Sequence, residues 1–166
     1  MSVVAAKVYG DGKIRVAADS IIVSGWSKRT DNFGKLEQIN GMIVGSVGTA
    51  YETSLMWQYM RTHKPDDSTD KDVLSFIIEF VRWKRELTGD ATVENAYLLV
   101  YKGHLFEVDG LFVHEVRNYI AIGAGRDFAT AALYLGHSPA EAVKAACELS
   151  CVVAEPIVCC ETTGEN

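Results

Sequence analysis

The chain has 166 residues, of which 48% are hydrophobic and 23% charged, a composition that is ordinary for a water-soluble globular protein. Its net charge of −6 comes with no basic block or stripe, which argues against nucleic-acid binding as the main role. No apolar stretch approaches the ~20 residues of a membrane span, and the N-terminus lacks the pattern of a signal peptide, so we expect a cytoplasmic protein.

The first 48 residues predict strands joined by tight turns. Asp11-Gly12 and Asn40-Gly41 each separate two apolar runs, as the turn residues of β-hairpins do. The polar segment 25–34 is expected to be a surface loop. The strands predicted here are Val3–Val8, Lys13–Ala18, Ile21–Val23, Leu36–Ile39 and Met42–Val47.

Two helices and then four strands are predicted for the middle of the chain. The helices are Thr49–His63 and Ser68–Leu87, and the second repeats apolar residues at i, i+3, i+4 and i+7. A third hairpin is expected around Lys102-Gly103. The strands are Ala96–Val100, Leu105–Val108, Leu111–Val116 and Tyr119–Ile122.

The last 44 residues predict two more helices and a strand. Gly123-Ala124-Gly125 is a tight turn that leads into the first helix. Ser138-Pro139-Ala140-Glu141 is a capping box with proline at the first helical position, so it begins the second helix. Pro156–Glu161 is the final strand.

This order of elements predicts an α/β (α+β) fold in one domain, residues 1–166. Because hairpins dominate, the sheets should be mainly antiparallel. Two sheets packed face to face, with a layer of helices on each outer side, would bury all the apolar faces. The prediction is therefore a four-layer αββα sandwich.

The four cysteines gather near the C-terminus, at positions 147, 151, 159 and 160. No C-x-x-C pair is accompanied by a second pair of ligands, so the sequence predicts no metal site and no cofactor. We expect reduced thiols buried in the core.

Four residues could carry chemistry, although each has a common structural role as well. Removal of Met1 would give Ser2 both a hydroxyl and a free α-amine, and this amine, with a pKa near ~8, can act as a base. Asp19 ends an apolar strand and could simply cap a turn, while Lys35 begins another strand and could simply be solvated. Gly48 joins a strand to a helix, where a backbone N–H can bind an oxyanion.

Taken together, these residues resemble those of proteasome β-subunits and the bacterial HslV-type peptidase, which are N-terminal nucleophile (Ntn) hydrolases. The resemblance covers nearly the whole chain. It rests on Ala17–Ser20, Lys35–Ile39, Val44–Ala50 and the segment Ile120–Ala129 with Ala131-Ala132. The last segment is the most specific, because it matches the family's Ile-Gly-Ser-Gly turn and the helix that follows. The resemblance implies the four-layer αββα fold.

The resemblance also implies a peptidase mechanism. Ser2 would attack a peptide carbonyl, Lys35 would favour the alkoxide, Asp19 would orient Lys35, and the Gly48 N–H would stabilise the oxyanion. An extended substrate would pair with the backbone near Val23, Gly48 and Ala50, and the pocket before the cut would be lined by residues such as Ile22 and Ser46. Family members form rings and depend on unfoldases, so a homo-oligomeric ring and an ATP-dependent unfoldase partner are expected.

The chain departs from the family pattern near the nucleophile. The usual threonine is Ser2, the serine of the Gly-Ser-Gly turn is Ala124, and two further polar supports of the amine fall at about Ser150 and Val153. Three hypotheses follow: an N-terminal serine peptidase, a catalytically inactive proteasome-like assembly protein, and an amidase that acts on a small molecule.

Overall fold

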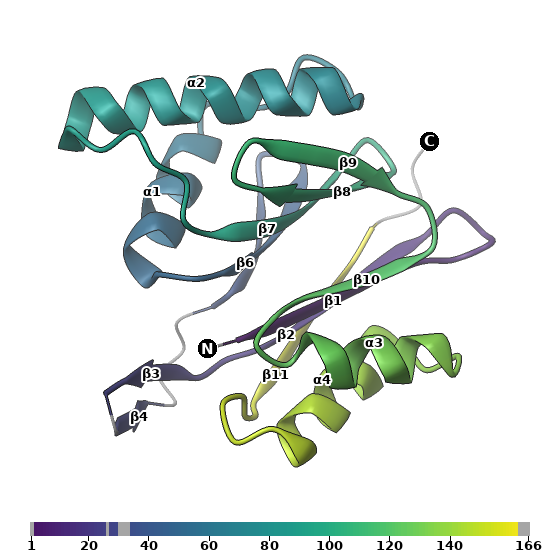
Figure 1. Ribbon diagram of the computed structural model, residues 1–166. Coiled ribbons are helices and arrows are strands. Elements are labelled where there is room, and N and C mark those ends of the chain that lie inside the picture. The colour runs from purple at the N-terminus through teal and green to yellow at the C-terminus, as the bar shows by residue number, and fades with distance from the viewer. Residues whose placement is uncertain (1, 26, 30–33, 163–166) are drawn as a thin grey trace.

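The computed structural model describes residues 2–25, 27–29 and 34–162 (Figure 1). Met1, whose removal the proposed nucleophile requires, lies outside the described residues, as do residues 26 and 30–33 of the expected loop. The helices are α1 (Ala50–Met60), α2 (Asp70–Thr88), α3 (Arg126–Tyr134) and α4 (Pro139–Leu149). The strands are β1 (Val3–Val8), β2 (Ile14–Asp19), β3 (Ile22–Ser24), β4 (Ser27–Arg29), β5 (Leu36–Ile39), β6 (Met42–Val47), β7 (Ala96–Tyr101), β8 (His104–Asp109), β9 (Phe112–Val116), β10 (Tyr119–Gly123) and β11 (Ile157–Glu161).

Two antiparallel sheets form the centre of the molecule. One has the strand order β10-β1-β2-β11, and the other has the order β5-β6-β7-β8-β9. Strand β1 is central in its sheet, because Val3 lies opposite Gly123 of β10 and Val4 lies opposite Ala18 of β2. The start of the chain is therefore held between two neighbouring strands.

The hairpin turns explain why consecutive strands pair. Asn40 and Gly41 have φ angles of 52° and 78°, and Lys102 and Gly103 have φ angles of 47° and 76°. Positive φ at both central positions defines the type I′ turn, whose twist matches that of the flanking strands. Both predicted hairpins are confirmed by the registers of β5 with β6 and of β7 with β8.

Local signals also define the helix ends. The Thr69 side chain caps α2 by accepting a hydrogen bond from the Asp72 N–H, and Gly89 ends the helix with φ 80°. The predicted capping box of Ser138 and Glu141 is present at the start of α4. None of the helices in the described residues is long and apolar enough to cross a membrane.

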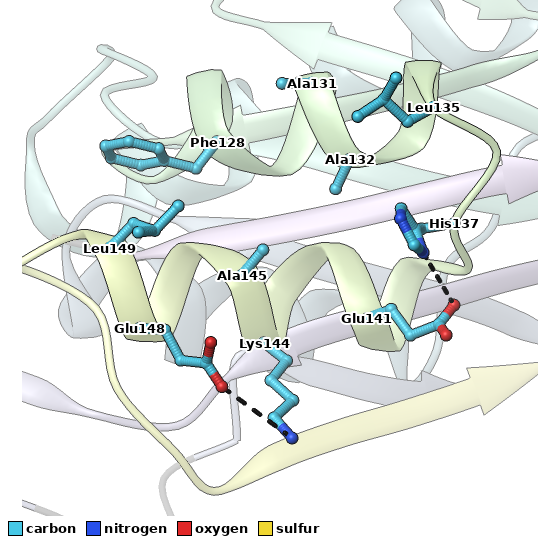
Figure 2. Close-up of a pocket in the computed structure, with 10 residues that line it drawn as sticks. All are labelled: Phe128, Ala131, Ala132, Leu135, His137, Glu141, Lys144, Ala145, Glu148 and Leu149. Carbon is cyan, nitrogen blue, oxygen red and sulfur yellow. Dashed lines mark ion pairs between the residues drawn. The ribbon is translucent and has the colours of Figure 1, made fainter.

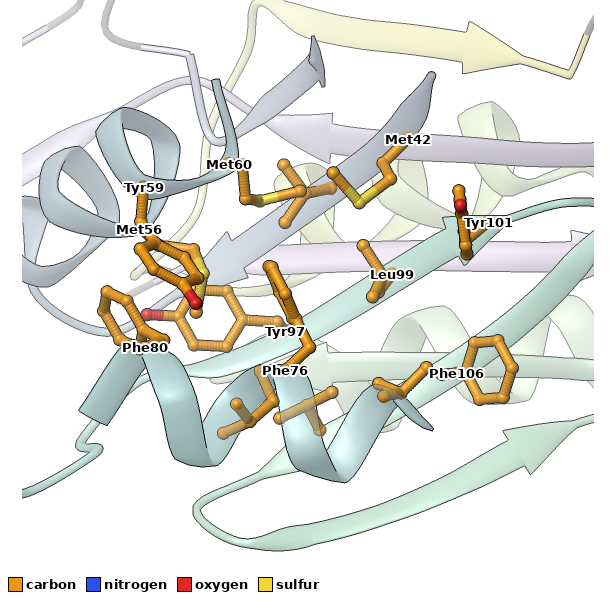
Figure 3. Packing of buried hydrophobic residues seen from close by; sticks show 14 of the residues in the cluster. Met42, Met56, Tyr59, Met60, Phe76, Phe80, Tyr97, Leu99, Tyr101 and Phe106 are labelled. Carbon is orange, nitrogen blue, oxygen red and sulfur yellow. The ribbon is translucent and has the colours of Figure 1, made fainter. Parts of the chain in front are cut away.

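Three apolar clusters separate four layers of structure. One lies between α1/α2 and the five-stranded sheet and contains large side chains such as Phe80, Tyr97 and Phe106 (Figure 3). The second lies between the two sheets, and the third lies between the four-stranded sheet and α3/α4. Figure 1 shows α2 above the sheets, with α1 at the left, and α3 and α4 below the sheets. The four-layer αββα sandwich is confirmed.

Two sequence expectations are wrong. Residues 27–29, expected to be part of a loop, form β4, because Ser27–Arg29 pair with β3. The cysteines are not all buried: Cys151 and Cys159 are exposed, whereas Cys147 and Cys160 are half-buried. Strand β11 is an edge strand, so solvent reaches Cys159 and, in part, Cys160.

Candidate active site

Ser2 lies at the start of β1, against the turn between β10 and α3. It is 5% exposed, and its carbonyl oxygen accepts a hydrogen bond from the Gly125 N–H at 3.2 Å. A Cβ built at Gly123 would lie 2.3 Å from the Ser2 carbonyl oxygen and 3.0 Å from Cγ1 of Val47. The absence of a side chain at Gly123 therefore lets Ser2 and the end of β6 approach the same point.

Asp19 connects the first strand to Lys35. It ends β2 opposite Ile157 and is completely buried. Its Oδ1 accepts a hydrogen bond from the Val3 N–H at 2.8 Å, and its Oδ2 accepts one from Lys35 Nζ at 2.7 Å. One carboxylate thus ties the residue after Ser2 to the ammonium group. The structure therefore brings Asp19 and Lys35 together beside Val3, the residue that follows Ser2.

The charge of Lys35 is set by two opposing effects. Burial lowers the pKa of Lys35, and the adjacent Asp19 carboxylate raises it; the net result is a pKa below the ordinary value of a lysine. The Asp19 ion pair favours the charged form, so Lys35 supplies a cation in a dry environment. In such an environment a charge acts more strongly than it does in water.

Gly48 occupies a turn that only glycine fits. It follows β6 and precedes Thr49, the N-cap residue of α1. Its φ is 131°, and a Cβ at this position would lie 2.1 Å from Oδ1 of Asn95. Gly48 itself is exposed, and its N–H has no hydrogen-bond partner within the described part of the chain. This N–H stands at the positive end of α1, where developing negative charge is stabilised.

The four residues expected near the substrate fall into two groups. Ile22 and Val23 lie in the short strand β3, and Ala50 is an exposed residue at the first position of α1. Ser46 is different: it is 2% exposed, and its hydroxyl lies 2.7 Å from the Thr53 hydroxyl. The Ser46 hydroxyl is therefore already paired within the protein.

The surroundings of the chain start are less polar than the family pattern. Ala124 occupies the turn where the family has serine. Val153 is buried and apolar, and the Ser150 hydroxyl accepts a hydrogen bond from the Val152 N–H at the end of α4. Among these three positions only Ser150 carries a hydroxyl, and that hydroxyl already accepts a local hydrogen bond.

Sequence reasoning missed a buried ionic cluster on the other side of the Gly48 turn. Lys84 Nζ donates to Glu52 Oε2 at 2.9 Å, and both side chains are at most 1% exposed. Glu52 Oε1 accepts hydrogen bonds from the Asn95 N–H at 3.0 Å and the Tyr97 hydroxyl at 2.9 Å. The available signal was Lys84 itself, which continues the apolar stripe of α2 four residues after Phe80.

A separate groove lies between α3 and α4 (Figure 2). Phe128 and Leu149 flank one end, and His137 and Glu141 form an ion pair at the other, with 3.8 Å between Nδ1 and Oε2. None of the predicted site residues lines this groove. Among the described residues, no group of three or more His, Cys, Asp or Glu side chains could hold a metal ion.

Comparison with known proteins supports the fold. No family model and no curated protein matches the sequence. Among solved structures, BPH from Thiobacillus denitrificans in complex with epoxomicin is similar, with a TM-score of 0.83 and 19% identity over 96% of this chain and 97% of that one. HslV from Trypanosoma brucei has a TM-score of 0.72 at 19% identity, covering 96% and 98% of the two chains. Anbu, an ancestral beta-subunit from Yersinia bercovieri, has a TM-score of 0.70 at 17% identity, covering 98% and 82%.

These similarities extend over nearly the whole of this chain. At such identities they establish the arrangement of the chain rather than its chemistry. The chain has the four-layer αββα fold of the proteasome-like Ntn hydrolases.

Proposed function

We propose that this chain is an N-terminal serine peptidase whose nucleophile is Ser2 after removal of Met1. The observation that carries the proposal is the Asp19 carboxylate, which binds both the Val3 N–H and Lys35 Nζ. A buried carboxylate and a buried lysine are costly to keep for structure alone. Here they hold a positive charge close to Val3, the residue next to the proposed nucleophile.

In the proposed acylation step, Ser2 Oγ attacks the carbonyl carbon of a peptide bond. The hydroxyl proton passes to the α-amine of Ser2, through a water molecule, while the positive charge of Lys35 favours the alkoxide. The carbonyl oxygen becomes an oxyanion that accepts a hydrogen bond from the Gly48 N–H, a contribution of about 3–4 kcal/mol in comparable sites. The C–N bond then breaks, and the leaving amine takes the proton from the α-ammonium group.

The proposed deacylation step reverses these roles. Water attacks the ester on Ser2, and the α-amine takes its proton. The second tetrahedral intermediate uses the same Gly48 N–H, and its collapse returns the proton to Ser2 Oγ. The carboxylic acid product then leaves, and the free hydroxyl and amine of Ser2 are restored.

We also propose how substrate reaches the site. An extended peptide adds as a strand beside the backbone of Val23, Gly48 and Ala50. Ile22 contributes apolar surface to the pocket, and Ser46 shapes the floor beneath it. Residues 1–166 act as one domain, and copies of the chain form a homo-oligomeric ring in the cytoplasm. An ATP-dependent unfoldase supplies this ring with unfolded protein.

A catalytically inactive assembly protein is the second candidate, and a specific observation favours it. Ala124 and Val153 are apolar where the family supports the amine with polar side chains. A poorly supported amine is a weaker base, and the fold and the ring do not require it. This candidate predicts rings that form normally and hydrolyse nothing.

The deciding experiment measures the mature N-terminus and activity on the same preparation. Intact mass spectrometry should show loss of Met1, and fluorogenic peptides should be cleaved. Ser2→Ala should abolish cleavage, whereas Ser75→Ala, on the exposed face of α2, should leave it unchanged. Covalent addition of a peptide epoxyketone such as epoxomicin should map to Ser2.

Each outcome separates the candidates. Retention of Met1 in purified, folded protein would remove the base and refute the peptidase. Loss of Met1 without cleavage or labelling would favour the assembly protein. Hydrolysis of small amides without cleavage or labelling by peptides would instead favour the small-molecule amidase.

A further inference from the structure

The Asn95 side chain is hydrogen-bonded to Thr49, the residue after Gly48, whose N–H is the proposed oxyanion donor. Asn95 is 1% exposed and directly precedes β7. Its Oδ1 accepts a hydrogen bond from the Thr49 N–H at 2.6 Å, and its Nδ2 donates one to the Thr49 carbonyl oxygen at 2.9 Å. Nδ2 also lies 3.0 Å from Oγ1 of Thr53 and 3.3 Å from Oγ of Ser46. A single amide therefore fixes both peptide groups of Thr49.

These contacts determine the geometry of Gly48 from both sides. On one side, Val47 pairs with Ala96, the residue after Asn95. On the other side, the Gly48–Thr49 peptide is held by the Asn95 amide. With Val47 paired in the sheet and the Gly48–Thr49 peptide hydrogen-bonded, Gly48 is held at its φ of 131° between two anchored neighbours.

The backbone of Asn95 is itself held by the buried ionic cluster. Glu52 Oε1 accepts a hydrogen bond from the Asn95 N–H, and Glu52 Oε2 accepts hydrogen bonds from the Glu94 N–H at 3.1 Å and from Lys84 Nζ at 2.9 Å. Lys84 also donates to the Thr92 carbonyl oxygen at 3.0 Å. Residues 92–95 are thus hydrogen-bonded to Glu52 of α1 and to Lys84 of α2.

We propose that Asn95 is a positioning residue that orients the Gly48 N–H toward the oxyanion. The inference rests on the proposed peptidase function and deepens it. A donor that is held in place before the reaction needs no reorganisation in the transition state, so it stabilises the transition state more than the bound substrate. Loss of Asn95 should therefore lower kcat and leave substrate binding almost unchanged.

The test compares two variants with a core variant that controls for a general loss of stability. Asn95→Ala removes every contact of the amide, and Asn95→Asp keeps an acceptor for the Thr49 N–H while losing the donor to the Thr49 carbonyl. Phe106→Leu loosens the core beneath α2 without touching the Gly48 turn. For Asn95→Ala, kcat should fall about 100-fold, the order expected of a misplaced catalytic group, with KM changed less than about threefold.

An inhibitor pair separates positioning from general destabilisation. A peptide aldehyde forms a hemiacetal whose oxygen occupies the oxyanion position, whereas the matching peptide amide binds without reacting. Asn95→Ala should weaken the aldehyde by the same factor as kcat/KM and leave the affinity of the amide unchanged. Asn95→Asp should lie between wild type and Asn95→Ala, and Phe106→Leu should change neither affinity.

Three results would overturn the inference, and they have different meanings. Unchanged kcat in folded Asn95→Ala, alongside an active wild type, would refute the positioning role alone. A wild type that neither cleaves peptides nor binds the aldehyde more tightly than the amide would refute the inference together with the proposed function. Equal weakening of the aldehyde and the amide would show that Asn95 serves structure only.

Discussion

Lys84→Met should lower the free energy of unfolding by about 3 kcal/mol, because it leaves the Glu52 carboxylate buried without its counter-charge. The side chains of Lys84 and Glu52 are 0% and 1% exposed, and 2.9 Å separates Nζ from Oε2. Methionine resembles the lysine stem in length, so the packing of the aliphatic part against α1 should largely remain. The loss then reports mainly the charge and its hydrogen bonds.

The magnitude follows from what each partner retains. Breaking a buried ion pair by removing one partner costs about 3–5 kcal/mol. Lys84→Met should lie at the lower end, because Glu52 keeps the Glu94 and Asn95 N–H groups and the Tyr97 hydroxyl as donors. Glu52→Ala should lie at the upper end, about 5 kcal/mol, because it leaves all three of these donors without an acceptor, although Lys84 keeps its ion pair with Asp90 at 2.8 Å.

Guanidinium unfolding followed by circular dichroism, at one protein concentration, measures these losses. For a chain of this length, a loss of 3 kcal/mol corresponds to a fall in Tm of about 6–12 °C. Lys102→Met is the matched control, since Lys102 Nζ also lies 2.9 Å from a carboxylate, that of Asp67, but the two side chains are 49% and 64% exposed. The control should cost less than about 1 kcal/mol. A Lys84→Met variant no less stable than Lys102→Met would refute this reasoning.

Three further predictions concern the site and its support. Gly48→Ala should lower kcat about 100- to 1000-fold, because its Cβ would lie 2.1 Å from Oδ1 of Asn95 and the oxyanion donor must move; an unchanged kcat would contradict this. Because the pKa of Lys35 is lowered, Lys35 loses its charge at a lower pH than an ordinary lysine does, so activity should fall on the alkaline side of the pH–rate profile. Asp19 raises the pKa of Lys35, so Asp19→Asn should move this alkaline limb to a still lower pH. Burial raises the pKa of Glu52, but the hydrogen bonds from Lys84 and the backbone lower it by more, so the net pKa lies below 4.5. The stability that Glu52 contributes should therefore be present above pH 4.5 and lost as the pH falls. Denaturant midpoints measured at decreasing pH should show this loss for wild type and much less of it for Lys84→Met.

Much of the fold follows from local sequence signals. Asn40-Gly41 specifies its own hairpin, because positive φ at both residues is a local preference that tertiary contacts need only keep. The capping box of Ser138 and Glu141 likewise acts within one turn of helix. Residues 27–29 carry no such signal: Ser27–Arg29 are polar, and they form β4 only because β3 lies beside them. A strand that depends on its partner cannot be predicted from its own composition.

The candidate site shows the same division. Asp19 and Lys35 could be proposed because each is a charged residue beside an apolar strand, in an order that resembles the Ntn hydrolases. Asn95 could not, because an asparagine before a strand ordinarily signals a turn, and its role arises from contacts with residues more than 40 positions earlier. Lys84 was visible only as a charge at an apolar position of α2, and its partner Glu52 lies 32 residues earlier in the sequence.

The buried cluster links stability to the geometry of the proposed oxyanion site. Apolar residues in place of a buried ion pair often give equal or greater stability, so stability alone does not require Glu52 and Lys84. Their specific effect is directional: Glu52 accepts the Asn95 N–H, and the Asn95 amide holds both peptide groups of Thr49, the residue that follows Gly48. An apolar pair at positions 52 and 84 could preserve the fold, but it would leave the Asn95 backbone without this acceptor. The expected result is a protein that keeps the fold at reduced stability, because the Glu94 and Asn95 N–H groups and the Tyr97 hydroxyl lose their acceptor, and in which the Gly48 N–H is poorly oriented.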